Sequence, residues 1–139
     1  TTWGGEELRR EYGAVVHTAP PFYRHHDDPE GALARCYAES IPLAFEAAEG
    51  GGRFGFLCPT AEGSDDSHSH VRVAMPLLGA GCRGFPLDVA VRIAAKEAVR
   101  WRNDVGLGGR RCILSFGIPD RDVAGALIDA IIEREQGKE

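Results

Sequence analysis

The chain has 139 residues, 43% of them hydrophobic and 27% charged, which is enough for one domain with an apolar core. Its formal net charge of −5 disfavours a main role in binding nucleic-acid backbones. The sequence has neither an apolar run of about 18 residues nor a secretory signal, which favours an intracellular protein, cytoplasmic or nuclear, without a membrane partner.

The first part of the chain is predicted to contain strands. Residues 1–3 resemble the end of a strand, and because the chain does not begin with Met we expect a trimmed or processed N-terminus. Residues 14–19 (AVVHTA) are mostly apolar and are followed by two prolines, which cannot donate to a strand ladder. This pattern predicts a buried strand, in which His17 is a core histidine with satisfied hydrogen bonds.

A helix is predicted to follow. Asp27 or Asp28 fits its N-cap, and Pro29 fits its first position. The predicted inward face consists of Leu33, Cys36, Tyr37, Ser40 and Ala44. Pro42 lies inside the helical pattern and removes one backbone hydrogen bond, so we expect a kink or break within residues 38–41.

Residues 49–70 show no periodicity and are predicted to be a flexible loop or an insertion that opens before the sheet does. They contain GGG at 50–52 and SDDSHSH at 64–70. If His68 and His70 share a strand face, a metal site needs further ligands, for which the candidates are His25, His26, Asp27, Asp28 and Cys58. A solvated polar loop without a metal is the favoured interpretation.

The centre of the chain is a strand, a glycine loop and a helix. Residues 71–77 are nearly all apolar, which predicts a strand buried on both faces. Residues 78–84 contain Gly79, Gly81 and Gly84, and a helical period begins at Pro86. The predicted inward stripe is Leu87, Ala90, Val91, Ala94, Ala98 and Trp101, and Arg92, Lys96, Glu97 and Arg100 lie largely off it. This arrangement presents backbone N–H groups to an anion such as phosphate, although such glycines also serve purely as turn formers.

The last unit is a strand at 111–116, a turn at 117–120 and a helix at 121–134, capped by Asp120. Its predicted inward residues are Ala124, Leu127, Ile128 and Ile131. Three strand–helix units indicate a single α/β domain over residues 1–139, with a mainly parallel sheet and helices on both faces. The cysteines, Cys36, Cys58, Cys82 and Cys112, form no C-x-x-C pair and are predicted to be reduced structural thiols. No pattern marks catalytic residues.

Four stretches carry a resemblance to a known family: GAVVHTAPPFYR (13–24), LARCYAESIPLAFEAA (33–48), VAMPLLGAGCRGFPLDVAVRIAAKEAV (73–99) and CILSFGIPDRDVAGAL (112–127). In wording and order they resemble the macrodomains, which bind ADP-ribose. The most specific part is Gly81, Gly84, Phe85 and Pro86, in register with the family's glycine loop. The resemblance implies a three-layer α/β/α macrodomain-like fold with a mostly parallel sheet that lacks the family's first strands.

In the family, the matching loop holds the diphosphate and the distal ribose with backbone amides. The resemblance therefore implies ADP-ribose or a related nucleotide diphosphate as ligand and no separate cofactor. The implied binding residues are Gly79, Ala80, Gly81, Cys82, Arg83, Gly84 and Phe85. Gly79 and Ala80 replace the family's loop hydroxyls. Arg83 replaces an aromatic residue, and its side chain either pairs with a phosphate or points to solvent.

These differences predict weak binding or inactivity in this form. Two other functions stay open. One is a non-catalytic scaffold or interaction domain. The other is part of an ADP-ribosyl or O-acetyl-ADP-ribose hydrolase that a further N-terminal segment completes.

The family's N-terminal strands and its N-A-A-N segment have no counterpart in the sequence. In the family's sheet, one strand lies between those matching residues 14–19 and 71–77, so we predict a slot roughly 9–10 Å wide. Unpaired buried backbone groups there would cost about 1–3 kcal/mol each. We therefore expect the slot to be filled by a preceding segment of a longer protein, by a strand from a second copy in a homodimer, or by direct pairing of the two strands.

Overall fold

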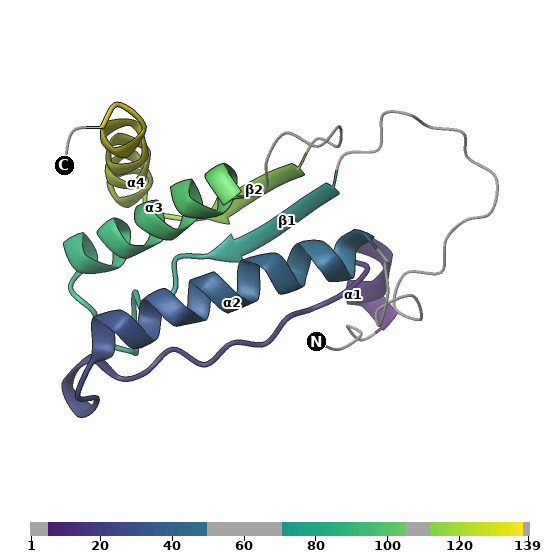
Figure 1. The fold of residues 1–139 in the computed structure, drawn as a ribbon. Helices are drawn as coiled ribbons and strands as arrows, with labels where there is room; N and C mark the ends of the chain where they lie inside the picture. The colour runs from purple at the N-terminus through teal and green to yellow at the C-terminus, as the bar shows by residue number, and fades with distance from the viewer. Residues whose placement is uncertain (1–5, 50–70, 105–111, 138–139) are drawn as a thin grey trace.

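The computed structural model of the chain describes residues 6–49, 71–104 and 112–137, which form four α-helices, one 3₁₀ helix and two β-strands (Figure 1). In chain order they are α1 (Glu6–Glu11), η1 (Tyr23–His25), α2 (Pro29–Glu49), β1 (Val71–Pro76), α3 (Leu87–Asp104), β2 (Cys112–Gly117) and α4 (Arg121–Glu135). This mixture confirms the α/β class. Among these helices, none has the length and apolar character needed to cross a membrane.

Two of the predicted features lie largely outside the described residues. They are the strand end at 1–3 and the loop at 49–70, of which only Glu49, the last residue of α2, is described.

The two strands form a parallel pair, with Val71 opposite Cys112 and Pro76 opposite Gly117. α3 lies between them in the chain and forms the crossover of about a dozen or more residues that two neighbouring parallel strands need. The strands predicted at 71–77 and 111–116 are confirmed to within one residue at each end. The parallel sheet predicted from the strand–helix order is thus confirmed for these two strands.

β1 is buried on one face only, and the prediction that both faces are covered is wrong. Its half-buried side chains are Val71, Val73 and Met75, and its exposed ones are Arg72, Ala74 and Pro76. Such alternation is typical of a strand with one covered face. Because Ala74 and Pro76 are apolar yet exposed, only Arg72 marks the exposed face in the sequence.

Residues 14–19 do not form the predicted strand. They run as an extended segment beside α2 (Figure 1), and within this segment only Val15 is a β-bridge residue. His17 is exposed, so its predicted place in the core is also wrong. An apolar run predicts that side chains are buried. A strand also needs a neighbouring strand that pairs with its backbone N–H and C=O groups, and the run by itself does not predict that neighbour. Among the described residues, β1 pairs with β2 and not with this segment.

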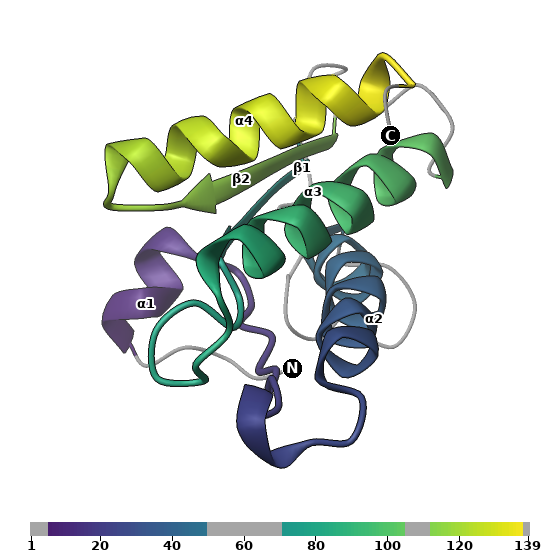
Figure 2. The same ribbon diagram turned by 90° about the vertical axis from the view of Figure 1, so that its left-hand side faces the viewer.

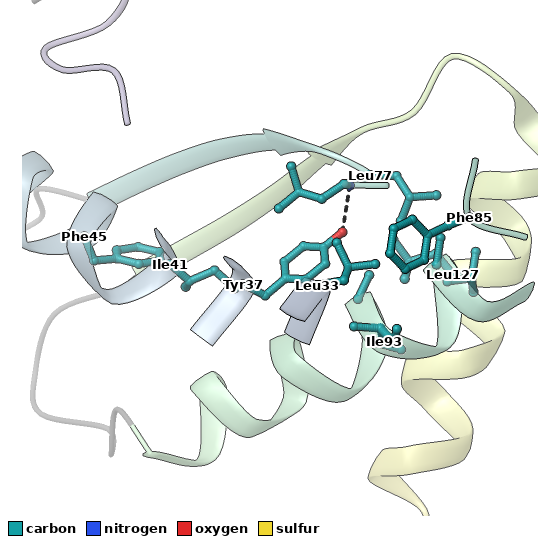
Figure 3. Packing of buried hydrophobic residues seen from close by; sticks show 13 residues of the cluster. Leu33, Tyr37, Ile41, Phe45, Leu77, Phe85, Ile93 and Leu127 are labelled. Carbon is teal, nitrogen blue, oxygen red and sulfur yellow. Dashed lines mark hydrogen bonds between the residues drawn. The ribbon is translucent and has the colours of Figure 1, made fainter. Parts of the chain in front are cut away.

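The core lies where α2, α3 and β1 meet. α2 presents Leu33, Tyr37, Ile41 and Phe45 at one-turn spacing, and all four side chains are buried (Figure 3). At the far end of this stripe, Phe45 stacks on Trp101 of α3 with ring centroids 4.5 Å apart. α3 packs against both α2 and α4, so it lies between the two other long helices (Figure 2).

Tyr37 joins this core to the chain that follows β1. Its hydroxyl oxygen accepts a hydrogen bond of 2.8 Å from the backbone N–H of Leu78 (Figure 3). Burial raises the pKa of the Tyr37 hydroxyl well above its ordinary value, although this hydrogen bond acts in the opposite direction. The hydroxyl therefore stays neutral and fixes the backbone at the start of the next loop.

α2 is continuous from Pro29 to Glu49, so the predicted break before Pro42 is wrong. At its start, the Asp28 carboxylate accepts a hydrogen bond of 3.0 Å from the backbone N–H of Gly31, which confirms the predicted cap. Pro42 is exposed, and so is Ala38, whose carbonyl loses its helical donor to the proline ring. On this exposed side water can hydrogen-bond to the carbonyl, and the buried stripe keeps the helix intact.

Two predicted inward residues and one predicted outward residue are placed differently by the structure. Leu87 is 51% exposed and Ile128 is 57% exposed, whereas Glu97 is only 4% exposed. α3 is covered from two sides, by α2 and by α4, so it buries a wider arc than a single stripe. That arc includes Ala90, Val91, Ile93, Ala94 and Ala95.

Asp120 caps α4 as predicted, and replacing it should weaken that helix. Its carboxylate accepts hydrogen bonds from the backbone N–H groups of Asp122 at 2.9 Å and Val123 at 3.1 Å. We expect Asp120→Ala to lower the free energy of unfolding by about 1 kcal/mol. Asp120→Asn, which keeps the acceptor, should cost much less. Chemical denaturation of both variants measures the difference, and equal losses would contradict the capping role.

Candidate functional site

The loop between β1 and α3 is shaped by three glycines. Gly79, Gly81 and Gly84 have φ angles of 83°, 100° and 74°, which residues with a side chain rarely adopt. The N–H of Phe85 donates to the carbonyl of Gly79 at 3.3 Å, and the N–H of Gly84 donates to that of Gly81 at 3.0 Å. These two hydrogen bonds fold the loop back on itself directly before α3.

The base of the loop is clamped in the core. Phe85 is 5% exposed, and its ring lies under Gly79. A Cβ atom on Gly79 would lie 2.9 Å from Cδ2 of Phe85 and 3.0 Å from Cδ2 of Leu33 in α2. In contrast, Gly81 and Gly84 are exposed and have open space where a Cβ would be. The loop therefore has a fixed base and an accessible rim.

Four consecutive amides on this loop are free to bind a ligand. Within the described residues, the N–H groups of Ala80, Gly81, Cys82 and Arg83 donate no hydrogen bond to the protein. They precede the N-terminus of α3, where the helix dipole adds positive potential. Free N–H groups at such a point suit an anion. The structure thus brings the predicted site residues together on one loop.

The η1 turn is fastened to this loop, a contact that the sequence analysis did not predict. The N–H of Tyr23 donates to the carbonyl of Arg83 at 2.9 Å, and the ring of Tyr23 lies 5.1 Å from that of Phe85. The guanidinium carbon of Arg83 lies over the ring of Phe22, 4.4 Å from its centroid. The aromatic and basic residues at 22–25 were the only indication in the sequence.

A cavity of about 780 Å³ lies between α2, residues 13–18 and β1. Ile41, Ala44 and Ala48 line it from α2, and Val73 and Met75 line it from β1. It lies where the empty slot was predicted. Since the described residues show no pairing of 14–19 with β1, direct closure is wrong for this structure. The other two occupants stay predictions.

The family model of the Macro domain matches residues 3–94. The chain belongs to the macro domain family. Macro domains generally bind ADP-ribose. The match confirms the family resemblance drawn from the sequence motifs. A comparison with curated proteins gives no match to the chain.

The matched part of this macro domain includes η1, α2, β1 and the entire glycine loop, and it ends within α3. β2 and α4 lie beyond it, although β2 pairs with β1 along its full length. The family match covers the loop without assigning roles to its residues. The binding roles of Gly79, Ala80, Gly81, Cys82, Arg83, Gly84 and Phe85 therefore stay predictions.

Two of the candidate metal ligands beside η1, His26 and Asp28, have local partners in the structure. Nδ1 of His26 accepts a hydrogen bond of 3.0 Å from the N–H of Asp28, whose carboxylate caps α2 and lies 3.9 Å from Arg35. In residues 6–49, 71–104 and 112–137, no three potential ligands gather into a metal-binding group. The remaining candidates, Cys58, His68 and His70, lie outside the described residues.

The described cysteines are free thiols. Cys36 and Cys112 are half-buried, and Cys82 is exposed on the glycine loop. Partial burial agrees with the predicted structural role of Cys36 and Cys112, whereas the exposed position of Cys82 gives it no packing role. Cys58 lies outside the described residues.

Proposed function

We propose that this macro domain binds ADP-ribose or a related nucleotide diphosphate through the loop at residues 79–85. The observation that carries the proposal is the run of free amides at Ala80, Gly81, Cys82 and Arg83, presented on a loop with a fixed base. A diphosphate offers several oxygen acceptors to such a run, and its negative charge is favoured at the N-terminus of α3.

Binding is favoured over catalysis because the loop presents mainly backbone groups. Its first two positions, Gly79 and Ala80, carry no hydroxyl that could orient a water molecule or the ribose. Within residues 79–85, the side chains that could take part in chemistry are limited to Cys82, which is exposed, and Arg83, which is half-buried. Such a loop positions a ligand without supplying a general acid or base.

Isothermal titration calorimetry with ADP-ribose, followed by amide chemical shifts, tests the proposal. We expect saturable heat with ADP-ribose and none with adenosine, which lacks the phosphates. The largest shifts should fall on the amides of Ala80, Gly81 and Cys82, because these groups donate directly to the ligand. Amides of α4, such as that of Asp129, are the internal control.

Two outcomes would count against the proposal. If neither ADP-ribose nor ADP produces heat, the domain does not bind this class of ligand and the scaffold function gains support. If ADP-ribose binds but the shifts concentrate on β1 and α2 around the 780 Å³ cavity, the ligand site is the cavity and not the glycine loop.

A further inference from the structure

We propose that the Arg83 side chain is a phosphate ligand of this domain and that the Phe22 ring holds it in position. The inference rests on the proposed function, because it concerns the same loop. It adds a charged side chain to a site otherwise made of backbone amides, and it thereby restricts the ligand class to compounds that carry a phosphate charge.

The contact with Phe22 fixes where the guanidinium lies. The guanidinium carbon is 4.4 Å from the ring centroid, well inside the range of a cation–π interaction, which extends to about 6 Å. Phe22 itself is braced by His25, whose ring packs edge-on with the two centroids 6.3 Å apart. A guanidinium that lies on a ring uses its flat face, so the N–H donors along its edge stay available.

No protein group takes up those donors in the part of the chain that the structure describes. There, no carboxylate lies within ion-pair distance of Arg83, and its side chain donates no hydrogen bond to the protein. Some other arginines of the domain are paired: Arg92 lies 3.0 Å from Glu30, and Arg35 lies 3.9 Å from Asp28. Within the described residues, Arg83 therefore combines a fixed position with a charge that no carboxylate neutralises, which suits a ligand oxygen.

Both backbone groups of Arg83, its N–H and its carbonyl, belong to the candidate site. Its own N–H is one of the four free amides, and its carbonyl accepts the hydrogen bond of 2.9 Å from Tyr23. The η1 turn thus holds the main chain of Arg83 while Phe22, the residue before Tyr23, holds its side chain. A phosphate bound to the loop amides would meet a guanidinium that is already positioned, at little further cost in side-chain entropy.

The test is calorimetry of ADP-ribose binding to the unmodified domain and to matched variants. Arg83→Ala should weaken binding about 10- to 100-fold, the range for losing a hydrogen-bonded charge pair. Arg83→Lys, which keeps the charge but not the fork of donors, should recover part of the affinity. The control is Arg24→Ala: Arg24 is exposed on η1 and also lacks an ion pair within the described residues, so the net charge changes equally.

Each result has a distinct meaning. A loss at Arg83 with Arg24→Ala within about twofold of the unmodified domain supports the proposal. Equal losses in the two variants would reduce Arg83 to a contribution of net charge, and no loss in either would remove it from the site. In both cases the proposed function would stand. If the unmodified domain does not bind ADP-ribose at all, the proposed function and this inference fail together. Unchanged thermal unfolding of the variants verifies that the loop stays folded.

Discussion

Replacing Leu33 with alanine is expected to lower the free energy of unfolding by about 2–5 kcal/mol. Leu33 is 0% exposed and lies where α2 meets the base of the glycine loop, next to Gly79 and Phe85. Its truncation would remove apolar contacts with the buried cluster around it, and neighbours that are held by backbone hydrogen bonds cannot collapse into the space. The loss is large compared with a typical total stability of about 5–15 kcal/mol.

Leu87→Ala is the matched control for Leu33→Ala. The two changes remove the same atoms from a helix, but Leu87 is 51% exposed at the start of α3. We expect the control to change stability by no more than about 0.5 kcal/mol. Guanidinium denaturation of both variants gives the comparison, provided that the slope of the unfolding free energy against denaturant concentration is the same in both. Similar losses would mean that Leu87 is covered in solution and that the arrangement of α3 is wrong.

Replacing Gly79 with alanine should have the second large effect, and it should act on stability and ligand binding together. The positive φ of 83° costs an alanine about 1–2 kcal/mol, and overpacking typically adds about 1–3 kcal/mol. Overpacking is expected because the new Cβ would lie 2.9 Å from Phe85. The loop would have to move away from its base, and the amides from Ala80 onward would move with it.

Two further glycines separate the cost of the positive φ from the cost of overpacking. Gly81 (φ of 100°) and Gly137 (φ of 67°) are also in the left-handed region, but a Cβ added at either would meet no atom of the described residues within 4 Å. Alanine at either position should lower the free energy of unfolding only by the cost of the positive φ, without the cost of overpacking. Of these two, only Gly81→Ala should weaken ADP-ribose binding, since Gly137 lies beyond α4. If all three variants lose equal stability, Phe85 and Leu33 yield freely and the base of the loop is not rigid.

Several features of the domain were correctly predicted because they depend on neighbours in the sequence. Asp28 and Asp120 cap α2 and α4 through backbone N–H groups two or three residues away. Gly81 and Gly84 have positive φ, as a sharp turn between a strand and a helix requires. The family motifs are also local sequence patterns, and the Macro domain match at 3–94 confirms those before residue 95, whereas the stretch at 112–127 lies outside the match.

Most of the errors share one physical origin, because they concern which distant segment covers a residue or pairs with it. The unbroken α2 at Pro42 is the exception. Periodicity placed Leu87 and Ile128 inside and Glu97 outside, but burial depends on where α2 and α4 pack against α3. Residues 14–19 have a strand-like composition but lack a backbone partner in β1.

The sequence by itself determined α2, α3 and α4, the caps of α2 and α4, the order of β1 and β2 around α3, the glycine loop and the family. Tertiary structure alone decided that Phe22 and Arg83, far apart in the chain, form one contact, and that residues 14–19 do not pair with β1. The reason is the range of the forces involved. Capping and turn formation act over a few bonds, whereas packing, pairing and cation–π contacts depend on how remote segments meet.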